Sequence, residues 1–313
     1  MIRIGTRDSK LALWQAEEVK GYLEGVLVGC ELVAVKSEGD VRLHQPLYAM
    51  GVTGIFTKVL DVALLNGEID LAVHSLKDVP TALPKGIVQA AVLKRGNVSD
   101  VLVLRRPTDI FNDFSSVGAI ASSSLRRQAQ WLHRFPHHLF HDIRGNVPTR
   151  LNKLAESRWD GAIFAAAGLE RVGIHPAHVM ALDWMLPAAG QGAVVVYCRE
   201  GDQKVLALLA VLSDWETEVC TCVERAFLAR LEGGCTAPIG ALATISEGRV
   251  FFKGNLLSLD GKDKNTIEMS GLVSDYKALG RYAAEDVLRS GGREIMDEVR
   301  RTKDGEAKDE VFK

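Results

Sequence analysis

The sequence predicts an α/β protein with two lobes, each built on a mostly parallel sheet, followed by a small α+β third domain. Short apolar runs alternate with helical patterns through the first two thirds of the 313 residues, which is typical of parallel sheets covered by helices. After Asp214 the pattern changes to one long helix followed by consecutive strands. A chain of this length holds two or three domains. Its 47% hydrophobic and 25% charged residues exclude disorder for most of it.

The predicted strands of the two lobes are short apolar runs, and the predicted helices lie between them. We expect strands at residues 2–5, 32–36, 71–74, 88–93, 101–104, 119–122, 139–143, 162–165 and 193–198. We expect helices at residues 9–23, 56–65, 125–135, 149–156 and 203–212. This alternation favours parallel pairing, with both faces of each sheet covered.

Two turn-rich segments, 94–97 and 186–192, predict two crossings between the lobes. The apolar run 193–198 is then expected to return to the first lobe. We therefore expect one lobe at 1–94 and 194–212, a second at 98–188, a third domain at 214–302 and a frayed tail at 303–313. Two lobes joined by two crossings would place a ligand cleft between them.

The third domain has its own start signal and turns. Asp214 is expected to cap a helix that runs to about residue 231, where Gly233 and Gly234 end it. Strands are expected at 241–245, 250–257 and 266–271, separated by the turn signals at 247–248 and 260–261. Helices are expected at 275–289 and 293–300. This order of elements predicts a small α+β unit.

Charge and cysteine content narrow the class of protein. The net charge of −2 argues against a general nucleic-acid binder. No apolar run reaches the ~18–20 residues of a membrane span, and the amino terminus has no signal-peptide pattern, so we expect a cytoplasmic location. Five cysteines without a paired framework fit a reducing compartment. Residues 126–158 nevertheless hold seven basic and two acidic residues, which indicates a site for a small anion.

The segment 72–80, AVHSLKDVP, places Lys77 and Asp78 just after a predicted strand. Ligands of open parallel sheets bind at this end of the strands. Lys77 would anchor an anion beside the carboxylate of Asp78. The alternative is an ordinary ion pair on a surface loop.

Two further segments join a loop, a helix start and arginines. Free N–H groups at a helix start bind anions, and arginine makes bidentate contacts with carboxylates. Solvated helix faces are the alternative for both segments. The candidates are Ser123, Ser124, Arg126 and Arg127 in the first segment, and Arg144, Gly145 and Arg150 in the second.

Cys235 lies in the loop LEGGCTAP at 231–238. The two glycines allow a bulky group to approach the backbone closely, and an accessible thiol there can act as a nucleophile. A helix cap followed by a buried cysteine is the alternative. We expect no metal site, because Pro136 interrupts the helix on which His133 and His137 would be paired.

Together these segments resemble the hydroxymethylbilane synthase family, also called the porphobilinogen deaminase family. The resemblance runs from residue 2 to about residue 240. The block 224–240 around Cys235 matches the cofactor-attachment signature of the family, and AVHSLKDVP at 72–80, SSLRRQ at 123–128, RGNV at 144–147 and GQGA at 190–193 match other family segments.

The resemblance implies two periplasmic-binding-protein-like lobes with mostly parallel sheets and a third domain that carries the cysteine. It implies a dipyrromethane prosthetic group joined to Cys235 by a thioether, with no metal. On this primer four porphobilinogen molecules condense head to tail, and ammonia and hydroxymethylbilane are released. Porphobilinogen is thus the expected small-molecule substrate, with neither nucleic acid nor membrane as a partner, and the protein is expected to be a monomer.

The resemblance also implies roles for individual residues. Asp78 is the catalytic carboxylate, because loss of ammonia from the substrate leaves a positive charge that spreads onto the pyrrole nitrogen. Each pyrrole carries an acetate and a propionate, so basic residues are needed to bind the chain. The implied cofactor-binding residues are Cys235, Lys77, Ser123, Ser124, Arg126, Arg127, Arg144 and Gly145, and the implied substrate-binding residues are Arg7, Ser9, Arg150 and Arg171.

The sequence departs from the family in one segment. Many relatives have a KGxFxKE pattern over the cleft, whereas this chain has Thr53 at the first lysine and Val59 at the glutamate, with Ala49 at another lysine position. We therefore expect residues 48–58 to act as a steric lid more than as an anion clamp. Pro148 also replaces a residue that is usually small.

Two other classes of protein are open on the residues alone. A non-catalytic two-lobed binding protein would need neither Cys235 nor Asp78, and would usually carry an export signal. A hydrolase with a cysteine nucleophile would need a base near the thiol, and His178 is the histidine nearest to Cys235 in sequence.

Overall fold

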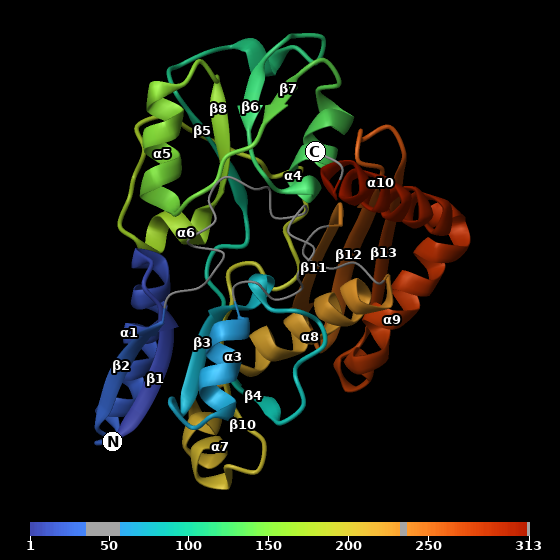
Figure 1. Cartoon of the computed structure of the whole chain (residues 1–313). Helices are drawn as coiled ribbons and strands as arrows, with labels where there is room; N and C mark the ends of the chain where they lie inside the picture. The colour runs from blue at the N-terminus through green and yellow to red at the C-terminus, as the bar shows by residue number, and fades with distance from the viewer. Residues whose placement is uncertain (36–56, 232–236, 312–313) are drawn as a thin grey trace.

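The computed structural model describes residues 1–35, 57–231 and 237–311, with side chains described up to residue 302 (Figure 1). It contains two five-stranded sheets and one three-stranded sheet. No helix in these ranges is both long and apolar enough to cross a membrane.

The first sheet has the strand order β2-β1-β3-β10-β4, and only β10 runs antiparallel to its neighbours. Helices cover both of its faces: α1 and α7 pack on one, and α3 packs on the other. The strands are therefore apolar on both sides, which is why they appear as continuous apolar runs in the sequence. The elements are β1 (Ile2–Arg7), α1 (Lys10–Gly25), β2 (Cys30–Val35), α3 (Lys58–Leu65), β3 (Leu71–Ser75), η2 (Leu76–Asp78), β4 (Ile87–Val92), β10 (Val194–Arg199), α7 (Gln203–Leu209) and η4 (Ala210–Leu212).

The second sheet repeats this arrangement with the order β7-β6-β8-β5-β9, and here β5 is the antiparallel strand. Helices α5 and α6 pack on one face and α4 packs on the other. The elements are β5 (Asp100–Leu104), η3 (Ile110–Asn112), β6 (Ala119–Ala121), α4 (Leu125–Arg134), β7 (Leu139–His141), α5 (Val147–Glu156), β8 (Gly161–Ala165), α6 (Ala166–Arg171) and β9 (Val179–Ala181). The predicted α/β class with mostly parallel sheets is confirmed.

The sequence pattern missed α6 and β9. Helix α6 has only 6 residues and β9 only 3, so neither is long enough to show a period. Val179 and Ala181 of β9 are exposed, so this strand lacks the apolar run by which the other strands were recognised.

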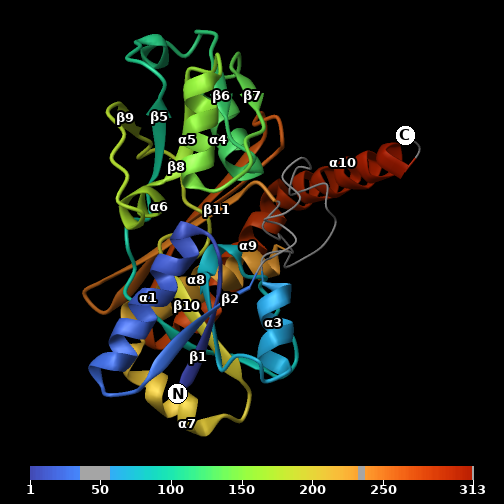
Figure 2. The same cartoon turned by 60° about the vertical axis from the view of Figure 1, so that its left-hand side comes forward.

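The two lobes contact each other through α1. Leu11, near the start of α1, packs against the core of the second lobe that contains Val147 and Ala166. Figures 1 and 2 both show the upper end of α1 next to α6. The lobes are therefore joined by side-chain packing as well as by the chain crossings.

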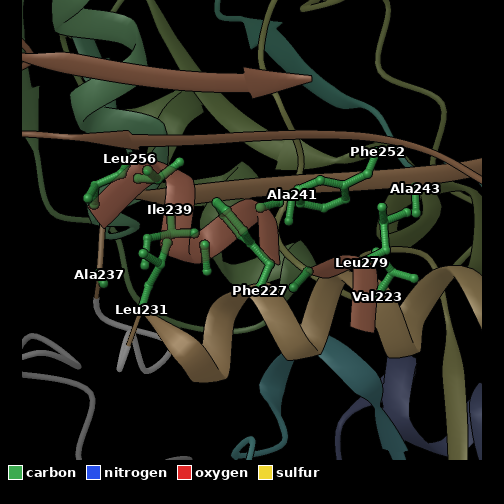
Figure 3. Packing of buried hydrophobic residues seen from close by; sticks show 14 of the residues in the cluster. Val223, Phe227, Leu231, Ala237, Ile239, Ala241, Ala243, Phe252, Leu256 and Leu279 are labelled. Atoms are coloured by element: carbon green, nitrogen blue, oxygen red, sulfur yellow. The ribbon is translucent and has the colours of Figure 1, made fainter. Parts of the chain in front are cut away.

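The third domain is an antiparallel sheet, β11-β12-β13, covered by helices. Phe227 of α8 packs against Phe252 of β12, and Figure 3 shows α8 lying under the sheet within this apolar cluster. Asp214 caps α8 by accepting from the Thr217 N–H, as predicted. The elements are α8 (Trp215–Arg230), β11 (Ile239–Ser246), β12 (Arg249–Leu257), β13 (Lys264–Leu272), η5 (Val273–Asp275), α9 (Tyr276–Val287), η6 (Leu288–Gly292) and α10 (Arg293–Val311).

Helix α10 is longer than the sequence pattern predicted. It continues to Val311 instead of ending near Arg300, and so includes most of the segment that was expected to be frayed. The added residues include Glu, Lys and Ala but also Asp, Thr and Gly305, which have poor helix propensity. No proline interrupts the segment, so the helix can continue through it.

Candidate active site

Lys77 and Asp78 follow β3 directly, in the short helix η2. Lys77 Nζ lies 3.3 Å from Gln191 Oε1, an acceptor on the second crossing. Gly192 of that crossing has φ +85°, and a Cβ there would lie 2.7 Å from the carbonyl oxygen of Gly96 on the first crossing. A glycine is therefore needed where the two crossings touch, next to the end of β3.

Arg126 and Arg127 are buried on α4 and share one carboxylate. Arg126 Nη1 lies 2.7 Å from Asp100 Oδ2, and Arg127 Nη2 lies 2.8 Å from Asp100 Oδ1. Burial by itself raises the pKa of Asp100, but the two arginines outweigh that effect and hold its pKa well below the usual range. Asp100 is therefore an anion that fixes both guanidinium groups.

The two serines before α4 organise the loop. Ser124 is the N-cap residue, and its Oγ accepts from the Arg127 N–H. Ser123 Oγ pairs with both the N–H and the carbonyl of Ile143 at 2.9 Å. These contacts tie the loop after β6 to the segment after β7, so the two predicted arginine segments lie side by side.

Arg144, Gly145 and Arg150 lie around the start of α5. Gly145 has φ +119°, and Asn146 caps the helix by accepting from the Thr149 N–H. Arg150 is half-buried, with its guanidinium carbon 4.6 Å from the centroid of the Phe164 ring. Its Nε is buried without a hydrogen-bond partner among the described residues. Because buried donors are normally hydrogen-bonded, this N–H is suited to donate to an acceptor that a ligand supplies.

Arg7, Ser9 and Arg171 lie close to the junction of the lobes. Arg7 ends β1, and Ser9 is the N-cap residue of α1, with its Oγ accepting from Ala12. Arg171 ends α6 and donates to the Gly192 carbonyl at 2.7 Å, with its guanidinium carbon 5.3 Å from the Trp14 ring centroid. The structure thus places Arg171 against the second crossing and against α1 of the first lobe.

The charged groups of the two lobes influence one another across the junction. Burial lowers the pKa of Lys77 to about 8, with a further lowering by Arg127, and the Asp78 carboxylate partly opposes this. Burial and Arg127 lower the pKa of Arg150 to about 10, and Asp78 again opposes the shift. Such shifts arise where partly buried cations are close together. Binding of an anionic ligand next to this cluster would therefore be electrostatically favourable.

This arrangement fits a dipyrromethane group. Its four carboxylates would be met by Lys77, Arg126, Arg127 and Arg144, which lie at neighbouring loops of both lobes. The fit rests on the lowered pKa of Lys77 and on the chemistry of these four cations, each of which can bind a carboxylate. The unpartnered Nε of Arg150 is left for the substrate. Cys235 lies outside the described residues, as do Ala49 and Thr53 and most of the predicted lid.

Sequence reasoning missed the acceptors that hold this cluster together. Besides Asp100, the fully buried Glu224 of α8 binds Arg95 Nη1 at 2.6 Å on the first crossing and the Gly190 N–H at 2.7 Å on the second. Glu224 also accepts from Arg95 Nη2 at 3.0 Å and from the N–H of Ala243 in β11 at 2.8 Å. Two signals were available for Glu224: it is an acidic residue on an apolar helix face, and it begins the block 224–240 that matches the family signature.

The fold and this cluster define a two-lobed α/β protein with basic side chains at neighbouring strand ends and one carboxylate among them, Asp78, that has no hydrogen bond or ion pair to any other described residue. A family model described as "Porphobilinogen deaminase, dipyromethane cofactor binding domain" matches residues 2–207, and one described as "Porphobilinogen deaminase, C-terminal domain" matches residues 218–289. The chain belongs to the porphobilinogen deaminase family, as the sequence motifs indicated.

Curated relatives agree over nearly the whole chain. The porphobilinogen deaminase of Syntrophotalea carbinolica is 42% identical over 299 residues, covering 94% of this chain and 95% of the relative. That of Synechococcus elongatus is 41% identical over 309 residues, covering 95% of each.

Solved structures with a similar arrangement include solute-binding proteins. An ancestral cationic amino acid solute binding protein matches with a TM-score of 0.44 and 15% identity, covering 67% of this chain and 87% of that one. The unliganded, open L-cystine solute receptor of Neisseria gonorrhoeae matches with a TM-score of 0.41 and 12% identity, covering 67% and 84%.

Proposed function

We propose that this protein is a hydroxymethylbilane synthase, an enzyme of tetrapyrrole biosynthesis. It condenses four porphobilinogen molecules head to tail on a covalent dipyrromethane primer, with release of ammonia and hydroxymethylbilane. The observation that carries the proposal is the position of Asp78. The charge of the Asp78 carboxylate raises the pKa of Lys77 in the first lobe and of Arg150 in the second, against the lowering by burial. Asp78 therefore lies near cations of both lobes, and a substrate whose carboxylates were bound by those cations would lie next to Asp78.

The chemistry follows from these charges. A porphobilinogen acetate and propionate would be bound by arginine and lysine side chains, which orients the ring. As ammonia leaves, positive charge develops on the pyrrole nitrogen, and the Asp78 carboxylate stabilises that charge. The bound primer supplies the pyrrole carbon that reacts with the activated substrate. Asp100 is a second carboxylate with a different role from Asp78: it pairs with Arg126 and Arg127 and keeps them in place.

Several finer assignments belong to the same proposal. The enzyme would be a transferase that acts as a monomer in the cytoplasm. The two lobes would comprise residues 1–94 with 194–212 and residues 98–188, and the cofactor-attachment domain residues 214–302. Cofactor contacts would come from Lys77, Ser123, Ser124, Arg126, Arg127, Arg144, Gly145 and Cys235, and substrate contacts from Arg7, Ser9, Arg150 and Arg171.

The attachment of the primer is tested by intact mass. We expect the purified protein to be heavier than its sequence by two pyrrole units, and the Cys235→Ala variant to lack this adduct. Cys222→Ala is a matched control, because Cys222 is a half-buried thiol of α8 that the proposal does not use. An active protein whose mass equals that of the bare chain would contradict the assignment.

The arginines are expected to separate into two groups. Contacts with charged groups contribute roughly 1.5–3 kcal/mol each. Arg126→Leu and Arg127→Leu should therefore impair assembly of the primer, whereas Arg150→Leu should keep the primer and stall during elongation. Mass spectra of the purified variants distinguish an absent adduct from accumulated intermediates.

Arg158→Leu is the control for these variants, because Arg158 is exposed in the same basic segment. It should turn over normally. Wild-type turnover in all three of the variants at Arg126, Arg127 and Arg150 would refute the role of those arginines in binding carboxylates.

A further inference from the structure

A cavity of about 340 Å³ lies where the second lobe meets the third domain. None of the residues assigned above to the primer or the substrate lines it. Its lining residues are Phe114, Gln130, His133, Arg134, Trp184 and Lys264. Figure 1 shows the two parts that form it, with α4 next to the end of the three-stranded sheet.

Aromatic and cationic groups form one wall of this cavity. The guanidinium carbon of Arg134 lies 4.8 Å from the Phe114 ring centroid and 5.0 Å from that of Trp184. Within the described ranges Arg134 makes these ring contacts but no hydrogen bond or ion pair. Its N–H groups are thus available to an acceptor, beside two rings that offer flat apolar surface.

Two more basic side chains complete the lining. His133 Nδ1 lies 2.8 Å from the Gly261 carbonyl oxygen, which can only accept, so Nδ1 donates to it; Nε2 of the neutral ring is then an acceptor and is not counted among the groups that would bind a carboxylate. Lys264 is exposed at the start of β13 and has no ion pair within the described ranges. Since none of the six lining residues is acidic, the charge of the cavity complements an anion.

The walls are held rigidly by contacts between the two domains. Gly261 has φ +74°, and a Cβ at this position would lie 2.5 Å from the Ala129 carbonyl oxygen, so the β12–β13 turn rests on the backbone of α4. Gln130 is only 4% exposed. It donates to the Leu186 carbonyl at 3.0 Å and accepts from Asn255 of β12 at 3.2 Å.

We propose that this cavity is a second binding site, distinct from the primer site, for a small aromatic carboxylate. A single ring would lie against Phe114 and Trp184, and its carboxylate would be bound by Arg134 and Lys264. The volume falls at the lower end of the range for small-molecule sites, which suits one ring and not an oligopyrrole. The occupant would bridge the second lobe and the third domain.

The cavity is connected to Arg126, one of the arginines assigned to the primer, by one shared hydrogen-bond acceptor. The Leu186 carbonyl accepts from Gln130, which lines the cavity, and also from Arg126 Nη1 at 2.7 Å. Helix α4 carries the cavity residues at its carboxyl end and Arg126 at its amino end. The Leu186 carbonyl would therefore link Gln130, which lines the cavity, to Arg126, which is proposed to bind the primer.

The probe for this site is 2-carboxyphenylacetate, a benzene ring with two carboxylates that cannot take part in pyrrole condensation. Isothermal titration calorimetry with the holoenzyme should show saturable binding. Lys264→Gln should weaken it at least fivefold, and Trp184→Leu should do the same. Lys262→Gln is the matched control, because this neighbouring lysine is 84% exposed and pairs with Asp260 instead of lining the cavity; its affinity should stay within twofold of the wild type.

Cyclohexane-1,2-dicarboxylate, which has the charges without the aromatic ring, should bind more weakly than the probe to the wild-type holoenzyme. Thermal melts check that each variant is folded, and Lys264→Gln replaces an exposed side chain on a strand that packs through its other face. Absence of saturable binding to the wild type, or equal affinity in the Lys264→Gln and Lys262→Gln variants, would overturn the proposal.

Discussion

Replacing Asp78 by Asn should reduce turnover by about two orders of magnitude or more while leaving the protein folded. The substitution keeps the shape of the side chain and removes its charge. A positioned group that stabilises charge or transfers a proton typically contributes ~10²–10⁴ in rate. The reason for a large effect here is the surrounding charge: Lys77 and Arg150 are half-buried cations, and the charge of Asp78 acts on both.

Two further measurements separate a catalytic role from a structural one. Asp78→Glu keeps the charge but displaces it by one methylene, so it should retain more activity than Asp78→Asn in steady-state kinetics. A thermal melt and the intact mass should show a folded protein, with the adduct on Cys235 still present. Near wild-type turnover in Asp78→Asn, or a loss of activity explained by unfolding, would show that the catalytic assignment is wrong.

Replacing Asp100 by Ala should produce the largest loss of stability among the charged residues of the second lobe. Its side chain is fully buried and pairs with Arg126 and Arg127, and Gln191 Nε2 also donates to it at 3.0 Å. Removing one partner of a buried ion pair typically costs about 3–5 kcal/mol, because the remaining charge is left uncompensated. Here two guanidinium groups would be left in that state.

Urea denaturation of the holoenzyme measures this effect. Asp100→Asn should be destabilised less than Asp100→Ala, since the amide oxygen still accepts from one arginine. Asp183→Ala is the control, because Asp183 is exposed and has no hydrogen bond or ion pair within the described ranges, and its unfolding midpoint should match the wild type. If Asp100→Ala were as stable as Asp183→Ala, the proposed role of Asp100 in compensating the arginines would be refuted.

Local patterns in the sequence were sufficient for most of the fold. The apolar runs 101–104 and 162–165 became β5 and β8, and Asp214 caps α8, because these features depend on residues that are neighbours in the chain. Family motifs extended this to the candidate site, since Lys77 and Asp78 do follow a strand end. The short elements α6 and β9 were missed because they contain too few residues to show a period.

The sequence by itself determined the fold class, the family and the segments that carry the candidate site, because each is written in contiguous residues. Only the tertiary structure decided which charges meet. Asp100 lies 26 positions before Arg126, and Glu224 lies 129 positions after Arg95, yet each pair forms an ion pair around a fully buried carboxylate. A buried charge is stable only when it is paired. The partner comes from an element that is distant in sequence, so a local pattern of residues cannot predict it.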